Sequence, residues 1–311
     1  MTFKDLQKLI HSQQNPEQSK LFQQLRNKPF WVWNVEEHKL EDIKTKGDCC
    51  FNHIIGLPTK EGIDKPLYDY EKIIFDSLHS SSIYDNDDND IIKNDNKISK
   101  HLWIKKATGL GITEFMLRYM AWLCLKDNKL SGSQMCIVTG PRIDLAITLI
   151  DRLKRLFRDT GVTFANKETV IELNGVRIEA FPSHHLDSIR GLPNVSFILL
   201  DEADFFPPGQ QQDARDVSER YIGKSNPYIV MVSTPNAPDG LFEKIEKESV
   251  ETCIYKRLLL DYTYGVNRIY TGEEIDKAKQ SPSFEREYNL KYLGHIGTVF
   301  HTKDIEAAIE R

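Results

Sequence analysis

Residues 197–204 of the chain read Phe197-Ile198-Leu199-Leu200-Asp201-Glu202-Ala203-Asp204. The four apolar residues predict a buried strand, and two adjacent carboxylates follow it directly. An aspartate at such a strand end can hold Mg²⁺, and a neighbouring glutamate can polarise the water that attacks a γ-phosphate. Because any buried strand can end in acids, assignment to a P-loop NTPase depends on companion motifs.

Two further stretches supply those companions. Upstream, residues 103–113 predict a strand, a glycine loop and a helix start, and read Trp103-Ile104-Lys105-Lys106-Ala107-Thr108-Gly109-Leu110-Gly111-Ile112-Thr113. Downstream, residues 229–236 predict an apolar strand that ends in hydroxyls, and read Ile229-Val230-Met231-Val232-Ser233-Thr234-Pro235-Asn236. The three strand ends carry phosphate, metal and sensor chemistry in that order, which favours a P-loop NTPase.

The glycine loop departs from the usual pattern G-x-x-x-x-G-K-[ST]. Gly111 and Thr113 occupy the second glycine and hydroxyl positions, but Ile112 stands where lysine belongs and Lys106 where the first glycine belongs. We expect Lys106 to replace the missing cation, because its long stem can reach the phosphates from the start of the loop, and Lys105 is the reserve candidate. The alternative is a degenerate loop that binds nucleotide without hydrolysis. The predicted nucleotide-binding residues of the loop are Lys106, Ala107, Thr108, Gly109, Leu110, Gly111, Ile112 and Thr113, with the Thr113 hydroxyl and Asp201 on Mg²⁺.

Composition sets outer limits on the function. The 311 residues are 40% hydrophobic and 28% charged, as in an ordinary globular enzyme. The net charge of −5 provides no overall attraction to nucleic acid, so such binding needs a local patch or oligomerisation. The five cysteines lack the C-x₂-C spacing of zinc sites. No signal peptide and no apolar run of roughly 18 residues is found, so we expect a cytoplasmic protein without a membrane span.

The order of predicted elements indicates an α/β fold. Strands and helices alternate after residue 100, which is typical of a mostly parallel sheet between helices, as in RecA-like P-loop NTPases. Asn174-Gly175 predicts a two-residue hairpin turn within this region. The predicted strands are 102–105, 135–139, 168–173, 176–181, 196–200, 227–233 and 253–260, and the predicted helices are 67–79, 112–127, 143–159 and 212–222.

The remaining segments define the predicted domain limits. Residues 1–66 form a small N-terminal helical and irregular element, with loop over 47–66, and residues 67–300 form the ATPase domain. Residues 80–99 are rich in Ser, Asp and Asn and predict a mobile acidic surface insertion. We expect Trp31 and Trp33 to pack rather than to stack on bases, and His184-His185 to lie in a loop.

The motifs together resemble the ATPase of viral large terminase subunits, the DNA-packaging motors. A phosphate loop that opens with lysine is similar to the form in lambda-like terminases. Ser188-Ile189-Arg190-Gly191-Leu192 resembles the family's arginine–glycine segment, and residues 288–300 resemble the segment that leads into its nuclease. The resemblance covers roughly residues 65–300 and implies binding of ATP and Mg²⁺, with Asp201 on the metal, Glu202 as the catalytic carboxylate, and Ser233 and Thr234 coupling hydrolysis to movement.

The resemblance also implies partners and limits. Double-stranded DNA, a small terminase subunit and a portal protein would be the partners, with a homo-oligomeric ring on assembly and a monomer in isolation. Tyr70-Glu71 occupies the place of the adenine-contacting segment. Residues 301–311 would begin the linker to a nuclease domain, so no nuclease activity is expected from residues 1–311.

Two arginines and two rival functions remain open. Arg142 follows a strand end and could act as an arginine finger or lie on the surface, while Arg190 could contact nucleotide or DNA. The basic helix 143–159 is either a DNA-tracking surface or a solvated face. The rival functions are a superfamily 2 helicase-like ATPase, because Asp201-Glu202-Ala203-Asp204 is followed by Ser-Thr-Pro, and a non-hydrolysing nucleotide switch.

Overall fold

A seven-stranded β-sheet forms the centre of the molecule. The computed structural model describes residues 16–33, 50–79, 100–236 and 238–293. The strand order is β5-β6-β4-β7-β8-β3-β9. The β5–β6 pair is antiparallel and the other neighbours pair in parallel, so the predicted mostly parallel sheet is confirmed.

The predicted strands and helices are present in the predicted order with small changes at their ends. The strands of the sheet are β3 (His101–Lys106), β4 (Gln134–Thr139), β5 (Val170–Leu173), β6 (Val176–Pro182), β7 (Val195–Asp201), β8 (Tyr228–Ser233) and β9 (Lys256–Leu260). The longer helices are α2 (Pro16–Leu25), α5 (Asp69–Leu78), α6 (Ile112–Leu125), α7 (Ile143–Arg155), α9 (Pro208–Glu219), α10 (Leu241–Lys247) and α11 (Gly272–Ala278). Short helices are α4 (Phe51–Ile54), α8 (Leu186–Arg190) and α12 (Phe284–Glu287). The helices α8, α10, α11 and α12 are additional to the predicted ones.

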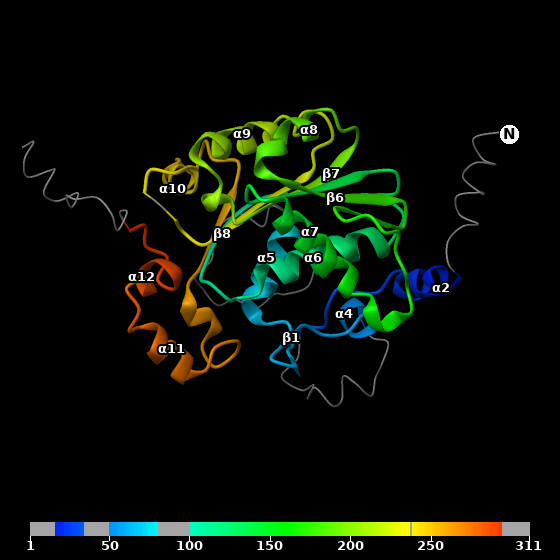
Figure 1. Ribbon diagram of the computed structural model, residues 1–311, viewed down its shortest axis with the longest axis horizontal. Helices are drawn as coiled ribbons and strands as arrows, with labels where there is room; N and C mark the ends of the chain where they lie inside the picture. Colours follow the sequence, from blue (N-terminus) through cyan, green and yellow to red (C-terminus); the bar gives the residue numbers. More distant parts are fainter. Residues whose placement is uncertain (1–15, 34–49, 80–99, 237, 294–311) are drawn as a thin grey trace, which may run out of the picture.

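Helices cover both faces of the sheet, with α8, α9 and α10 on one side and α5, α6 and α7 on the other (Figure 1). Successive apolar side chains along the strands point to opposite faces of the sheet and pack into two separate hydrophobic cores. Phe197 and Leu199 of β7 pack towards α6, whereas Ile198 and Leu200 pack towards α9. Since successive strand residues point to opposite faces, an apolar run such as 197–200 is what a strand covered on both faces requires.

The β5–β6 hairpin has the turn that its sequence predicts. Asn174 (φ 50°) and Gly175 (φ 76°) are both left-handed, as a type I′ turn demands. The Asn174 side-chain amide also donates to the carbonyls of Cys124 (2.8 Å) and Asp127 (3.0 Å). The turn is thereby tied to the end of α6.

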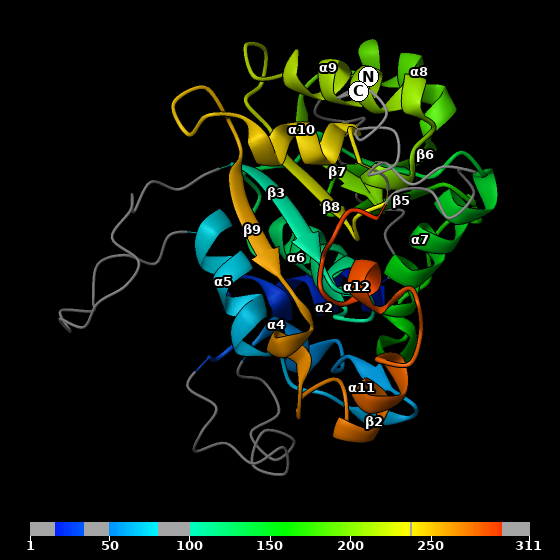
Figure 2. The same ribbon diagram turned by 90° about the vertical axis from the view of Figure 1, so that its left-hand side faces the viewer.

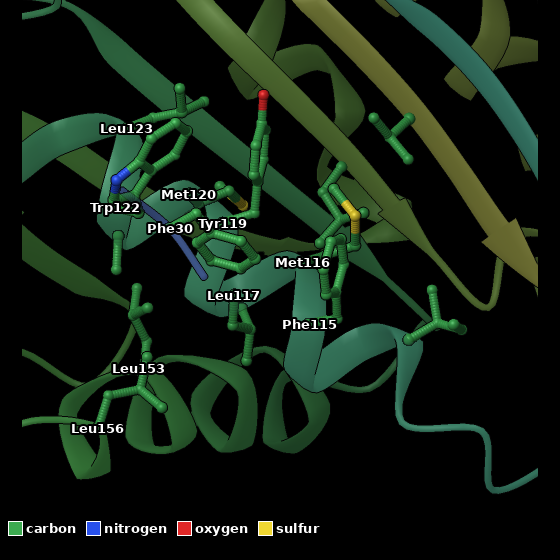
Figure 3. Packing of buried hydrophobic residues seen from close by; sticks show 14 of the residues in the cluster. Phe30, Phe115, Met116, Leu117, Tyr119, Met120, Trp122, Leu123, Leu153 and Leu156 are labelled. Carbon is green, nitrogen blue, oxygen red and sulfur yellow. The ribbon is translucent and has the colours of Figure 1, made fainter. Parts of the chain in front are cut away.

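The N-terminal segment packs into the main core rather than standing apart. Phe30 is buried against Phe115, Tyr119 and Trp122 of α6 (Figure 3). Trp31 is buried, and the Trp33 ring lies tilted beside that of Phe75 with 5.7 Å between the ring centres, so both tryptophans pack as predicted.

Two local predictions need correction. The described part of the predicted loop 47–66 contains α4 and the hairpin of β1 (Thr59–Lys60) and β2 (Ile63–Asp64). Its turn uses Glu61 and Gly62, both left-handed, and a glutamate there is a weaker turn signal than asparagine. Ser183–His185 forms a single 3₁₀ turn instead of a loop. The acidic insertion 80–99, residues 294–300 and the predicted linker 301–311 lie outside the described residues.

Candidate functional site

Three strand ends meet at one edge of the sheet. β8 lies between β7 and β3, and the register places Lys105 beside Ser233 and Asp201 beside Val232. Because the three strands are parallel, the ends that carry Lys106, Asp201 and Ser233 lie at the same edge. Open α/β sheets bind their ligands at this edge.

The loop after β3 turns sharply into α6. Gly109 (φ 78°) and Gly111 (φ 77°) are left-handed, a conformation that glycine adopts without steric penalty. Gly111 is the N-cap of α6, so the unpaired N–H groups of the helix's first turn open onto the loop. A helix N-terminus with such a loop is a ready anion site. The side chains of Ala107, Leu110 and Ile112 are buried, so these residues offer a ligand only backbone groups.

Contacts from distant segments hold the loop in place. The Tyr70 hydroxyl in α5 donates to the Leu110 carbonyl at 2.7 Å. From the other side, the Tyr270 hydroxyl donates to the Thr108 carbonyl, and the Thr108 N–H donates to the Glu287 carbonyl of α12 at 2.8 Å. Figure 2 shows α12 at the arrow end of β3. The loop is thus clamped between α5 and the segment that contains α11 and α12.

The two adjacent lysines of β3 point to opposite faces. Lys106 Nζ lies 2.6 Å from Glu202 Oε1 and 3.2 Å from Thr234 Oγ1, with a side chain only 8% exposed. Lys105 Nζ instead binds both oxygens of Glu246 in α10, at 2.6 and 2.8 Å. Lys106 is therefore the lysine that faces the acids of β7.

Asp201 and Thr113 form the candidate metal position. The Thr113 hydroxyl donates to Asp201 Oδ1 at 2.8 Å. Burial, and next the charge of Glu202, raise the pKa of Asp201 to about 6. One carboxylate and one hydroxyl fit Mg²⁺, which takes few protein oxygens and completes its shell with water and substrate phosphates.

Glu202 is held in an unusual backbone conformation. Its φ of 53° and ψ of 44° are left-handed, which is uncommon for a residue other than glycine and recurs at functional sites. The Thr234 N–H donates to Glu202 Oε2 at 3.2 Å, and Ser233 Oγ lies 3.3 Å from the same oxygen. One carboxylate oxygen thus faces Lys106 while the other rests on the end of β8.

The third acid of the same stretch, Asp204, had no predicted role. Its N–H donates to Ser233 Oγ at 3.2 Å, and its Oδ2 accepts from the Asn236 N–H at 2.6 Å. Burial raises its pKa to about 6. Asp204 therefore joins the ends of β7 and β8. The repeated acid in Asp201-Glu202-Ala203-Asp204 is the sequence signal that could have identified it.

Tyr70 and Glu71, predicted to contact adenine, are built into the wall of the site. Tyr70 holds the loop through its hydroxyl, and Glu71 Oε2 accepts from the Tyr68 N–H at 2.7 Å, capping α5. Both side chains are buried. Burial raises the pKa of Glu71 to about 8, so this carboxyl is largely neutral at pH 7.

The two predicted arginines lie outside this cluster. Arg142, the N-cap residue of α7, is 75% exposed and pairs with Asp144 at 2.6 Å. Arg190, at the end of α8, pairs with Asp187 at 3.0 Å. The ion pairs of both arginines are therefore with acids of their own helices, and neither pairs with Glu202 or Asp201.

A cavity of about 890 Å³ opens beside the loop. Its walls include Gly109–Gly111, Tyr70 and Glu71, together with Arg152 of α7. In the sequence, Arg152 is only one of several basic residues in the predicted helix 143–159. Its proximity to the loop depends on how α7 packs against α6, which periodicity alone does not reveal.

Comparison with known proteins bears on the fold. The sequence matches no protein-family model, and no curated protein matches it. Solved structures do match. The HK97 bacteriophage large terminase has a TM-score of 0.54 at 14% identity, covering 74% of this chain and 51% of that one. The large terminase of a thermophilic bacteriophage has a TM-score of 0.51 at 13% identity, covering 66% and 52%. The ATPase domain of the Thermus phage P74-26 large terminase has a TM-score of 0.48 at 14% identity, covering 63% and 90%.

The fold is therefore that of the P-loop ATPases. Two of the structures that it resembles are phage large terminases. This chain spans about half the length of the HK97 and thermophilic-phage proteins, at 51% and 52%. In the part of the chain that the structure describes, no helix is long and apolar enough to cross a membrane.

Proposed function

We propose that the chain is a Mg²⁺-dependent ATPase and the motor domain of a DNA-packaging terminase. The observation that carries this proposal is the presence of two hydrogen-bonded side-chain pairs beside a phosphate-type loop. Lys106 pairs with Glu202 at 2.6 Å and Thr113 bonds Asp201 at 2.8 Å. A cation, a metal position and a candidate general base thereby lie around the start of α6.

The loop and Lys106 would bind the phosphates. The first N–H groups of α6 attract anions, and Lys106 can turn its flexible stem from Glu202 towards the β- and γ-phosphates. That exchange separates the Lys106–Glu202 pair and frees Glu202 when substrate is present. Tyr70 and Glu71 would border the nucleoside.

Glu202 would then orient the attacking water and accept its proton. Its second oxygen is already held by the Thr234 N–H and lies near Ser233 Oγ. Magnesium, when bound by Asp201 and Thr113, would neutralise charge on the phosphate oxygens. Loss of the γ-phosphate would change the contacts of Ser233 and Thr234. Asp204 connects Ser233 to the loop that precedes α10.

The proposed motor has partners and a domain plan. Residues 67–300 would form the ATPase domain and 301–311 the start of a linker, with 1–66 as an accessory element. Double-stranded DNA, a small terminase subunit and a portal protein would be its partners in the host cytoplasm. Arg190, exposed on α8, is the proposed contact to DNA or to a phosphate.

The test is a steady-state ATPase assay with and without linear double-stranded DNA, on the wild type and on Glu202→Gln. We expect DNA-stimulated hydrolysis that the variant loses. Nucleotide binding without turnover would favour the non-hydrolysing switch, and ATP-dependent strand separation would favour the helicase.

Assembly has its own test. The exposed Arg142 would complete a neighbour's site in the ring, and such an arginine is worth about 10³-fold or more in related NTPases. Specific activity should therefore rise with protein concentration, and Arg142→Ala subunits should poison mixtures more than proportionally. Activity proportional to concentration, without poisoning, would exclude this role.

A further inference from the structure

The cavity beside the phosphate loop is large and positively charged. Its volume of about 890 Å³ lies in the range of small-molecule sites. The cations that line it are Lys60, Lys65, Arg118, Arg152, Arg155 and Arg158. The acids that line it are Asp64, Glu71, Glu114 and Asp159, of which Glu71 is largely neutral because burial raises its pKa to about 8. The six cations therefore outnumber the charged acids, and an anionic ligand is favoured.

Two of these arginines share one carboxylate, Glu114, in the first turn of α6. Arg118 Nε binds Glu114 Oε1 at 2.9 Å, and its NH1 binds the Asn52 side chain (3.0 Å) and the Gly56 carbonyl (2.7 Å). Its side chain is only 5% exposed. Arg118 is therefore fixed in the protein and keeps Glu114 in place.

Arg152 is bound differently. Its NH2 lies 3.2 Å from Glu114 Oε2, and its side chain is 34% exposed. A guanidinium carries five N–H donors, so most of those on Arg152 remain free for a ligand in the cavity. Glu114 can release Arg152 and stay paired through Arg118.

We propose that Arg152 binds the phosphates of the nucleotide held at the phosphate loop, and that Glu114 positions it for this contact. The inference rests on the proposed ATPase function, since it assumes that the phosphates lie at residues 106–113. Arg152 lines the same cavity as Gly109–Gly111. Burial raises the pKa of Asp201, and the charge of Arg152 is among those that oppose the rise, which places Arg152 within electrostatic reach of the metal position.

A simpler role would be neutralisation of Glu114, an acid in the helix turn that faces the phosphates. The two roles differ in one respect. Neutralisation makes Arg152 dispensable once Glu114 has lost its charge, whereas a direct contact does not.

The experiment measures equilibrium binding of ATP, ADP and AMP to the full chain by fluorescence. We expect Arg152→Ala to weaken ATP and ADP binding about tenfold and AMP binding less, since a hydrogen bond to a charged group is involved. Lys154→Ala is the matched control, because it removes a cation from the same helix outside the cavity and should bind as the wild type does. Thermal unfolding checks each variant, and Arg152→Gln replaces Arg152→Ala if the latter does not fold.

The Glu114→Gln background separates the two roles. A direct contact predicts that Arg152→Ala still loses about tenfold in that background. Equal binding of ATP by Glu114→Gln and by the double variant would overturn the proposal. Wild-type affinity of Arg152→Ala for ATP would also overturn the proposal. If Lys106→Ala loses ATP binding in the same assay, the proposed ATPase function still stands. A wild-type chain that binds none of the three nucleotides would overturn both.

Discussion

Lys105 and Lys106 form nearly identical ion pairs in very different surroundings. Each is buried, and each has a glutamate oxygen at 2.6 Å. Lys105 and Glu246 pack among rings, with Lys105 Nζ 4.6 Å from the ring centre of Tyr292 and 6.0 Å from that of Trp103. The Lys106 pair instead lies beside the phosphate-type loop and the Thr113–Asp201 bond.

The two pairs differ in what would replace the glutamate if the lysine separated from it. Lys105 is only 6% exposed, so loss of Glu246 would leave its buried charge without its carboxylate partner. The Lys106 pair has Thr234 as a second contact and a glycine loop next to it, and in the proposed function a phosphate would replace the carboxylate. We infer that the first pair stabilises the fold and that the second is a resting state of the site.

Removing the charge of each glutamate should distinguish the two ion pairs most clearly. Glu202→Gln should retain ATP binding and lower kcat by about 10²-fold or more, because the group that orients and deprotonates water is lost. Glu246→Gln, the matched control, should keep kcat and lower the unfolding temperature. Steady-state kinetics and nucleotide titration measure both, and an unchanged kcat in Glu202→Gln would refute the assignment.

Removing each lysine in turn tests which of the two contacts the phosphates. Lys106→Ala should weaken ATP binding or hydrolysis by about 10–100-fold, as loss of a charge-assisted contact implies. Lys105→Ala should leave binding unchanged and destabilise the fold by about 1–3 kcal/mol, since it removes the partner of the partly buried Glu246. Equal effects on nucleotide binding would mean that neither lysine is aimed at the phosphates.

The side chain at position 112 shows why the usual lysine is not simply restored. Ile112 is 1% exposed and packs in the core. Ile112→Lys would bury a charge there, so we expect it to destabilise the protein without rescuing Lys106→Ala. Recovery of activity in that double variant would contradict this placement.

The two buried aspartates of β7 and its extension allow a third test. Asp201→Ala should raise the Mg²⁺ concentration needed for ATP binding about tenfold, because a carboxylate ligand is lost. Asp204→Ala should leave the Mg²⁺ dependence unchanged and affect turnover through Ser233. Magnesium titrations of nucleotide affinity distinguish them, and identical curves for Asp201→Ala and wild type would exclude the metal role.

A separate test concerns Glu71 and the pH dependence of stability. Its pKa is raised in the fold from 4.5 to about 8, so folding takes up a proton between these values. Stability from this group is complete below about pH 4.5 and falls as pH rises towards 8, by up to about 1.4 kcal/mol per pH unit. The stability of Glu71→Gln relative to the wild type should therefore increase from pH 5 to pH 8.

Urea denaturation at pH 5, 6.5 and 8 measures this change. Asp76→Asn, on the exposed side of α5, is the control and should differ from the wild type by a constant amount. A constant offset for Glu71→Gln as well would show that Glu71 is ionised in the fold.

Most of the fold was predictable because its signals are local. The apolar run 197–200, the Asn174-Gly175 turn and the strand–helix alternation each lie within a few residues, and all three predictions are confirmed. The edge that carries the site was predictable for the same reason, since parallel strands place their carboxyl ends together. The hairpin of β1 and β2 was missed because Glu61-Gly62 is a weak turn signal.

The partners inside the site were not predictable in this way. Glu202 reaches Thr234, and Tyr270 reaches Thr108, across 32 and 162 positions of sequence. Arg152 meets Glu114 because α7 packs against α6, and nothing in the periodicity of helix 143–159 selects that side chain from its basic neighbours.

The amino-acid sequence alone specifies which chemical groups are present and the local backbone geometry. A strand with acids at its end, a loop whose glycines permit left-handed backbone, and the absence of lysine at position 112 can all be read without coordinates. Only the folded structure shows which of two adjacent lysines faces the acids. It also shows what Tyr70 and Glu71 contact, and that Arg152 borders the cavity. The physical reason is that strand alternation and helix packing set the direction of each side chain, and both depend on the layers assembled around the sheet.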